Sequence, residues 1–309
     1  MAARHSYQFV FRMTRPAAQP TYLFPEGRKF NIDNIVLHAR AKRHKVTDFA
    51  GPLSIKTVVN GSVGWTVGCR EYMVDNTSFL VLGNGEKYSM DFDEPQSMET
   101  ACVFFQTGFV EKMAQDATTP LKASLDDPDR AAPPLPYISR LHADPDRTIV
   151  QRVQTLARRC SAALQPSSFE EDFLLISNDL LGLYEQIRSR MERVPALKSS
   201  TREELFRRLE TGREYIHGHA DSPLSLEAVA RAACLSRYHF HRVFAQVYEK
   251  TPHAYLTEIR LARAQSLLKR GMAVVDVCVD IGFSSPSSFS RLFRTRYGVS
   301  PAAARKMGS

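Results

Sequence analysis

The last third of the chain contains an internal repeat. A pattern of small and apolar residues in 226–235 recurs in 274–283, an offset of 48, and a second pattern in 240–252 recurs in 289–301, an offset of 49. Two copies of one supersecondary unit therefore follow each other, with one residue inserted in the second copy. The matched residues are Leu226, Val229, Ala230, Ala233, Cys234 and Leu235 with Val274, Val277, Cys278, Ile281, Gly282 and Phe283, then Phe240, Arg242, Phe244, Tyr248 and Pro252 with Phe289, Arg291, Phe293, Tyr297 and Pro301.

Each copy predicts a short helix, a tight turn and a second helix. Gly282 supplies the turn in the second copy, because glycine adopts positive φ without steric cost, and Cys234 holds the same position in the first copy. Ser285 followed by Pro286 is typical of an N-cap and a first helical residue. This arrangement is a helix-turn-helix.

The second helix of each copy has an apolar face and a polar face. Phe240 and Phe289 belong to the apolar faces, and neither polar face contains a carboxylate. Side chains that bond base edges or phosphates in this pattern suit a DNA major groove, whereas an ordinary solvated helix face would be expected to carry acidic residues as well. The candidate DNA-contacting residues are Arg237, Tyr238, His239, His241, Arg242, Ser287, Ser288, Ser290, Arg291 and Arg294.

Two further helices are expected around these units. Thr201 and Glu204 form a capping box that predicts the start of a helix continuing to Ile216. Thr251 and Pro252 predict the start of a linking helix that ends at Lys269-Arg270-Gly271. At 1.5 Å per residue the linking helix spans roughly 27 Å, which suits two recognition helices in successive major-groove segments about 34 Å apart.

Several segments of this region match a known family. They are Ser225-Leu-Glu-Ala-Val-Ala230, Leu235-Ser-Arg-Tyr-His-Phe240, Arg242-Val-Phe244, Ile259-Arg-Leu-Ala-Arg-Ala264, Asp280-Ile-Gly-Phe-Ser284, Phe289-Ser-Arg-Leu-Phe293 and Tyr297-Gly-Val-Ser-Pro301. Through them, residues 201–306 closely resemble the DNA-binding domain of the AraC/XylS transcriptional regulators. The sequence departs from the family at Cys234, where glycine is frequent, and at Ala304, where an aromatic residue is usual.

The resemblance implies a seven-helix domain that binds asymmetric DNA sites. Base contacts are implied for the positions of Tyr238, His241 and Arg242, and for Ser287, Ser288, Ser290 and Arg291 in the second copy. The family also implies a cupin-like N-terminal barrel that senses a small-molecule effector. Promoter DNA and RNA polymerase are the expected partners, and no enzymatic activity is expected.

The distribution of charge agrees with a polyanionic partner for the C-terminal third. The chain of 309 residues has a net charge of +8. Residues 1–200 contain 24 Lys and Arg against 23 Asp and Glu, whereas residues 201–309 contain 17 against 10, a net charge of +7. This asymmetry indicates that one part of the protein meets DNA and the other part has a different role.

The sequence predicts a two-domain α+β protein. Short β-like runs with Gly and Asn turns up to about residue 110 favour an antiparallel barrel, residues 126–136 predict a loop, and two amphipathic helices are expected within residues 146–188. The predicted domains are residues 1–190 for the effector-sensing and dimerisation domain, with the barrel to about 110, and residues 201–309 for an all-α DNA-binding domain. Residues 191–200 are the predicted linker.

The first of those amphipathic helices carries an apolar stripe with two possible partners. It either packs on the barrel or pairs with a second subunit, and the stripe favours a homodimer because a complete barrel has little unfilled core. The candidate dimerisation residues are Ile149, Val153, Leu156 and Leu164, with Val150 on the same stripe.

The predicted barrel offers candidates for an effector site but no metal site. Aromatic residues dominate small-molecule sites, so Trp65, Tyr72, Tyr88 and Phe105 are candidates to line a pocket, although each also fits plain barrel core. Lys56 is expected on the wet face of its strand. His5, His38 and His44 lack metal-ligand spacing, so no metal or cofactor is expected.

Two alternative functions are weighed against the ligand-responsive regulator. A DNA-repair alkyltransferase needs an activated cysteine in a Pro-Cys-His-Arg setting, and none of the five cysteines has one. A constitutive regulator whose barrel only dimerises is left open. The cysteines suggest reduced, mostly buried thiols, and the lack of a long apolar segment or signal peptide predicts a soluble cytoplasmic protein.

Overall fold

The computed structural model describes residues 21–23, 29–118, 140–144, 146–161 and 169–308. The chain divides into two compact units, Met1–Ile187 and Arg188–Ser309. The predicted loop at residues 126–136 lies outside the described residues. No helix in the described part of the chain combines the length and the apolar character that crossing a bilayer requires.

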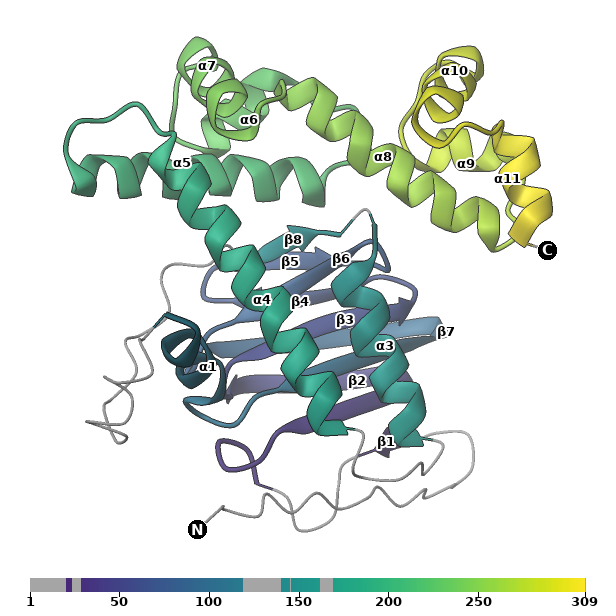
Figure 1. Cartoon of the computed structure of the whole chain (residues 1–309). Coiled ribbons are helices and arrows are strands. Elements are labelled where there is room, and N and C mark those ends of the chain that lie inside the picture. Colours follow the sequence, from purple (N-terminus) through teal and green to yellow (C-terminus); the bar gives the residue numbers. More distant parts are fainter. Residues whose placement is uncertain (1–20, 24–28, 119–139, 145, 162–168, 309) are drawn as a thin grey trace. The chain divides into compact units, whose positions relative to one another are not determined.

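The first unit is built on one eight-stranded antiparallel sheet (Figure 1). The strands β1 (Thr21–Leu23), β2 (Ile35–Ala50), β7 (Lys87–Phe104), β3 (Ser54–Asn60), β6 (Ser78–Leu82) and β8 (Leu141–Ala143) follow one another in hydrogen-bonded order. β4 (Val63–Val67) pairs with β5 (Arg70–Val74) and also with the first part of β7, whereas β3 pairs with the last part of β7. Because one long strand takes different partners at its two ends, the sheet curls into a nearly closed barrel, as predicted.

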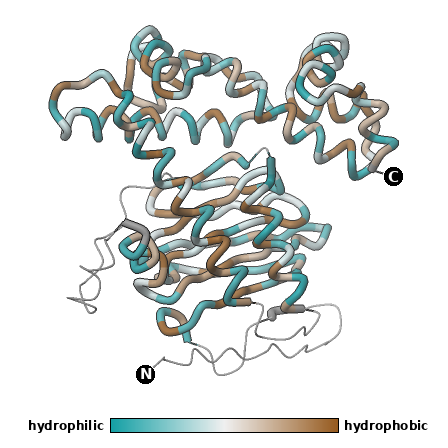
Figure 2. The backbone as a smooth tube through the Cα atoms, in the orientation of Figure 1, coloured by the Kyte–Doolittle hydropathy of each residue, from teal (hydrophilic) through white to brown (hydrophobic). Residues whose placement is uncertain are grey.

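Apolar residues lie on both faces of this sheet. Short hydrophobic and hydrophilic stretches alternate along its strands and helices (Figure 2). The inner cluster contains Val58, Val63, Trp65, Val67, Tyr72, Val74, Leu80, Leu82, Tyr88 and Met90, all from strands. The outer cluster joins alternate residues of β3, β6 and β7 to α1 (Phe109–Thr118), α3 (Thr148–Ser161) and α4 (Phe169–Glu192). β3 is therefore buried on both faces.

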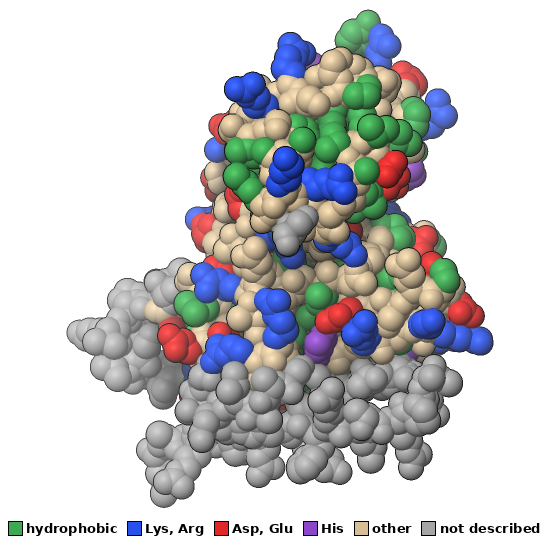
Figure 3. All heavy atoms as spheres, turned by 90° about the vertical axis from the view of Figure 1, so that its right-hand side faces the viewer, with side chains coloured by type: hydrophobic (Ala, Val, Ile, Leu, Met, Phe, Trp, Pro, Cys, Tyr) green, Lys and Arg blue, Asp and Glu red, His purple; other side chains and the backbone are tan. Residues whose placement is uncertain are grey.

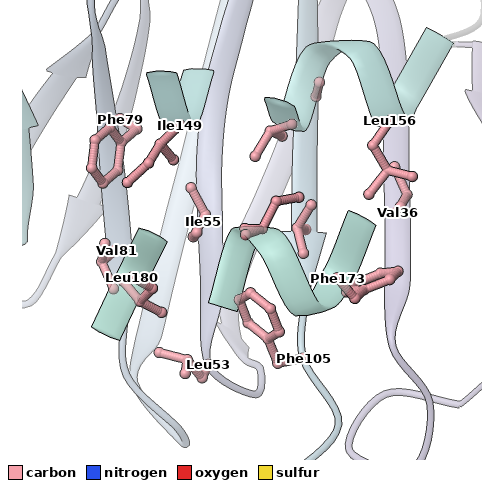
Figure 4. Close-up of a cluster of buried hydrophobic side chains, with 14 of the residues drawn as sticks. Val36, Leu53, Ile55, Phe79, Val81, Phe105, Ile149, Leu156, Phe173 and Leu180 are labelled. Carbon is pink, nitrogen blue, oxygen red and sulfur yellow. The ribbon is translucent and has the colours of Figure 1, made fainter. Parts of the chain in front are cut away.

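The apolar stripe assigned to dimerisation packs on the sheet instead. Ile149, Val153 and Leu156 are buried within one chain, against Val36, Ile55 and other residues of the outer cluster (Figure 4). The dimerisation hypothesis for these residues is wrong, and the alternative of packing on the barrel holds, because the outer face of the sheet is apolar and needs a cover. Leu164 lies outside the described residues.

The second unit forms seven helices over residues 199–308, the number that the family resemblance implied. They are α5 (Ser199–Gly218), α6 (Leu226–Ala232), α7 (Arg237–Tyr248), α8 (Pro252–Lys269), α9 (Val274–Asp280), α10 (Pro286–Tyr297) and α11 (Pro301–Gly308). The predicted linker, residues 191–200, covers the last two residues of α4, the segment that follows it and the first two residues of α5.

The capping box predicted at Thr201 and Glu204 is wrong. α5 begins two residues earlier, at Ser199, whose hydroxyl donates a hydrogen bond to Glu203. Glu204 instead forms ion pairs with Arg207 and Arg208 on the helix surface. The carboxylate of Glu204 therefore bonds to side chains three and four residues later in the helix and does not cap the helix N-terminus.

The prediction of mostly buried cysteines is also wrong. Only Cys102 and Cys278 are buried, Cys160 is half-buried, and Cys69 and Cys234 are exposed. All five are free thiols. Cys69 and Cys234 both lie in turns, where little of the chain can cover them.

Candidate nucleic-acid interface

The two predicted turns have the predicted backbone conformation. Cys234 and Gly282 lie at φ of +53° and +74°, in the left-handed region that favours glycine. A Cβ atom on Gly282 would lie 2.7 Å from the carbonyl oxygen of Asp221, so the second turn has no room for a side chain. The helix-turn-helix arrangement is confirmed in both copies.

Serine caps set the start of both recognition helices. The hydroxyl of Ser236 accepts a hydrogen bond from the amide of His239 at 3.3 Å, and Ser285 accepts one from Ser288 at 3.3 Å. Pro286 occupies the first turn of α10, as predicted. These caps place the following side chains of α7 and α10 at fixed positions on each helix.

The polar faces of α7 and α10 are open to solvent. Phe240, Phe244, Phe289 and Phe293 are buried on the inner faces, and the side chain of Tyr238 is 78% exposed. Of the candidates, Arg237, Tyr238, His241, Arg242, Ser287, Arg291 and Arg294 are exposed, and His239, Ser288 and Ser290 are half-buried.

The recognition arginines differ from other arginines of the unit in their partners. The guanidinium groups of Arg242, Arg291 and Arg294 form no ion pair or hydrogen bond within the described residues. By contrast, Arg208 is paired with Glu204, and Arg260 donates to the carbonyl of Ala220. Figure 3 shows Lys and Arg side chains projecting around an apolar area on one side of this unit. Both recognition helices therefore carry arginines whose guanidinium groups have no partner in the described part of the chain, Arg242 on α7 and Arg291 and Arg294 on α10.

Comparison with known proteins agrees with this geometry. Residues 229–307 match a family model described as a helix-turn-helix domain. The transcriptional regulator ArgR of Pseudomonas aeruginosa is 32% identical over 87 residues, covering 28% of this chain and 26% of ArgR. ExsA of the same organism is 31% identical over 113 residues, covering 36% of this chain and 41% of ExsA. The C-terminal domain is of the AraC/XylS type. The chain thus matches about a quarter to two fifths of the length of these curated relatives.

Solved structures of AraC-family proteins are also similar. A probable AraC family regulator from Rhodopseudomonas palustris covers 33% of this chain with 23% identity and a TM-score of 0.32, and the match spans 97% of that protein. Apo ToxT from Vibrio cholerae covers 91% of this chain and 100% of its own, with 14% identity and a TM-score of 0.37.

Sequence reasoning missed a contact within the first recognition helix of the AraC-type domain. A guanidinium nitrogen of Arg237 lies 3.3 Å from the hydroxyl of Tyr238, and the guanidinium carbon lies 5.0 Å from the ring centroid. The positive charge therefore rests against the most exposed aromatic ring of α7. Their adjacency in sequence was the only signal for this pairing.

A buried polar network fixes α7 within the AraC-type domain. The carboxylate of Glu210 accepts two hydrogen bonds from Arg213, at 2.9 and 3.0 Å, and one from the hydroxyl of Tyr248. Arg213 also lies 3.4 Å from the hydroxyl of Tyr255. The network joins α5, α7 and α8, and the i,i+3 spacing of Glu210 and Arg213 was its only trace in the sequence.

The linking helix α8 belongs to both halves of the AraC-type domain. Thr251 caps it by accepting a hydrogen bond from Ala254, and Pro252 occupies its first turn, as predicted. Near its start Tyr255 contacts Phe244, with ring centroids 5.7 Å apart, and near its end Leu268 packs in one cluster with Phe289. One continuous helix of 18 residues therefore spaces the two recognition helices.

The structure separates the four aromatic candidates for an effector site. Trp65, Tyr72 and Tyr88 come together in the inner cluster of the barrel. Phe105 lies on the outer face and packs against Phe173 of α4, so its placement in the barrel interior is wrong. Phe105 directly follows the last residue of β7, and its side chain points to the face opposite that of Phe104, since side chains alternate along an extended chain.

The position predicted for Lys56 is wrong as well. Its side chain is buried, although it was expected on a wet face. The strand that carries it, β3, is covered by the inner cluster on one face and by α3 and α4 on the other, so no wet face exists there.

The histidines have ordinary surroundings. His38 lies 2.8 Å from a carboxylate oxygen of Glu99, and burial lowers the pKa of His44. Within the described residues, no group of three His, Cys, Asp or Glu side chains is placed to hold a metal ion, and His5 lies outside them.

Proposed function

We propose that this protein is a sequence-specific DNA-binding transcriptional regulator whose N-terminal barrel responds to a small-molecule effector. The observation that carries the proposal is the pair of solvent-facing recognition helices, α7 and α10, with unpaired arginines and no carboxylate. Arg242 and Arg291 are suited to bidentate contacts with guanine, and Ser287 and Ser290 to shorter polar contacts. Promoter DNA and RNA polymerase are the proposed partners.

One copy of the chain is proposed to bind each DNA site, which has two segments. The apolar stripe that favoured a dimer is covered within the chain, and each AraC-type domain already carries two recognition helices. Homodimerisation is therefore not needed to explain binding to two groove segments.

A selection from random duplex DNA tests the proposal. The full chain should enrich an asymmetric motif with two conserved segments about one helical turn apart. Footprinting of the enriched site should protect both segments. A library that remains random after repeated rounds, with binding that is equally tight to every duplex, would contradict sequence-specific recognition.

A further inference from the structure

Lys56 is a buried cation inside the barrel. It lies in the middle of β3, its side chain is 1% exposed, and its cross-strand neighbours are Leu80 and Cys102. Val58, two residues further along the same face of β3, belongs to the inner cluster, so Lys56 faces the barrel interior. Lysine is almost never fully buried unless it has a partner.

The partners of Lys56 are aromatic. Its Nζ donates a hydrogen bond to the hydroxyl of Tyr88 at 3.3 Å and lies 3.6 Å from the ring centroid of Phe104. Within the described residues no carboxylate pairs with it. Burial lowers the pKa of Lys56 to about 7. The protein thus keeps an amine in an apolar setting that lacks a counter-ion.

A second polar group on the same strand face has no partner. Ser54 is 1% exposed, and its hydroxyl has no hydrogen-bond partner in the described part of the chain. Ser54 lies two residues from Lys56, and its cross-strand neighbour is Phe104, the ring against which Nζ rests. The amine therefore extends toward the end of β3 where this hydroxyl lies.

We propose that Lys56, Ser54 and Tyr88 form the polar end of an effector site that takes a small monocarboxylate with an apolar body. The inference rests on the proposed sensory role of the barrel and adds the chemical class of the effector. All three groups can donate hydrogen bonds, and a carboxylate offers about four acceptor positions. The inner cluster to which Tyr88 belongs, which also contains Trp65 and Tyr72, is apolar or aromatic and matches an apolar body.

Binding would exchange one contact of Lys56 for another. The four-carbon stem allows Nζ to leave the Phe104 ring and form an ion pair with the carboxylate, which supplies the missing counter-ion. A single lysine matches one negative charge, so a monocarboxylate fits better than a phosphate monoester. A neutral amide of the same shape provides no counter-ion.

The test uses the full chain and matched probe pairs. Phenylacetate and hexanoate at millimolar concentration should raise the melting temperature of the first unit, whereas phenylacetamide and hexanamide should not. Affinity should be constant just below the pKa of about 7. It should fall about tenfold per pH unit above that value, because the ion pair then requires uptake of a proton. Calorimetry in buffers of different ionisation enthalpy should detect that proton.

Variants assign the effect to the site. Lys56→Met should lower the affinity for the carboxylates to that for the amides and abolish proton uptake, and Ser54→Ala should weaken binding partially. Lys45→Met is the matched control, because Lys45 lies on the same sheet but is exposed and paired with Asp91 at 2.7 Å. It should bind like the wild type.

Several results would overturn the proposal. They are equal stabilisation by acid and amide, carboxylate binding without proton uptake, unchanged binding in Lys56→Met, and no binding of either acid. If Lys56→Met fails to fold, calorimetry of the wild type decides: proton uptake on carboxylate binding supports the proposal, and its absence overturns it. DNA binding is measured on the same preparation to separate the two proposals. A failure to bind DNA would count against the proposed role of the AraC-type domain, and a failure to bind carboxylates would count against this site.

Discussion

Lys56 should also leave a signature in the pH dependence of stability. Its pKa is lowered by burial from 10.5 to about 7, so between these values the unfolded chain binds a proton that the native state lacks. Stability therefore rises with pH in this window, by about 1.4 kcal/mol per unit, and the full cost of the buried amine is present below it. The free energy of unfolding of Lys56→Met should lack this slope. Parallel curves for the two proteins would show that the amine titrates normally.

Single arginines on the recognition helices should govern separate parts of the DNA site. Arg242→Ala and Arg291→Ala should each weaken specific binding by about 1–3 kcal/mol and relax base preference in different segments. Arg208→Ala is the control, since Arg208 is paired with Glu204 on α5. Quantitative footprinting with base-substituted sites measures both effects. Unchanged preference in both variants would place the reading face elsewhere.

The exposure of the candidate DNA-contacting residues could be predicted from the sequence, and the burial of Lys56 in the barrel could not. Tyr238, Arg242 and Arg291 face solvent as expected because their exposure follows from the helical period of their own segment. The burial of Lys56 depends on which elements cover β3, and α3 and α4 come from residues about a hundred positions later in the chain. Alternation along a strand identifies two faces but does not say whether both are covered.

At the scale of elements, α3 should behave as part of the core of the first unit. Leu156→Ala removes a side chain that is 0% exposed and should destabilise this unit by about 2–5 kcal/mol. Leu174→Ala on α4 is the control, because Leu174 is 45% exposed and should change stability little. Denaturant unfolding measures the difference. A lower association constant without loss of stability would restore the dimerisation hypothesis.

The two turns of the repeat should respond in opposite ways to substitution. Gly282→Ala introduces a side chain at positive φ and within 2.7 Å of the Asp221 carbonyl, so it should cost more than about 1 kcal/mol. Cys234→Gly relieves a left-handed non-glycine residue and should be neutral or slightly stabilising. Thermal unfolding of the full chain compares them. Equal destabilisation by the two changes would contradict the assignment of turn geometry.

Elements with local signals were predicted more fully than elements without them. Caps, periodicity and glycine located α7, α8 and α10 because each signal acts within a few residues. The full length of β2 had no such local signal, because the strand is rich in charged residues and lacks a continuous apolar run. The start of α5 was misplaced because its N-cap residue, Lys198, makes no side-chain cap hydrogen bond and so leaves no capping signal in the sequence.

At the scale of the whole molecule, DNA binding should depend steeply on salt. The net charge of +7 in residues 201–309 includes arginines without acidic partners, and their phosphate contacts release counterions. Six such contacts would give a slope of about −5 in a log–log plot of the binding constant against salt concentration. Titration of the full chain against its selected site measures the slope. A nearly flat dependence would rule out a phosphate-dominated interface.

The continuous helix α8 gives the bound protein a direction. Its two ends pack near recognition helices whose exposed faces differ. The face of α7 carries tyrosine, histidine and arginine, whereas that of α10 carries serines and arginines. A site for one molecule therefore has a distinguishable beginning and end, unlike the palindrome that two identical subunits read. Such a site has an orientation on the chromosome. Under the proposed function, turning such a site around would reverse the direction in which the bound protein faces along the DNA.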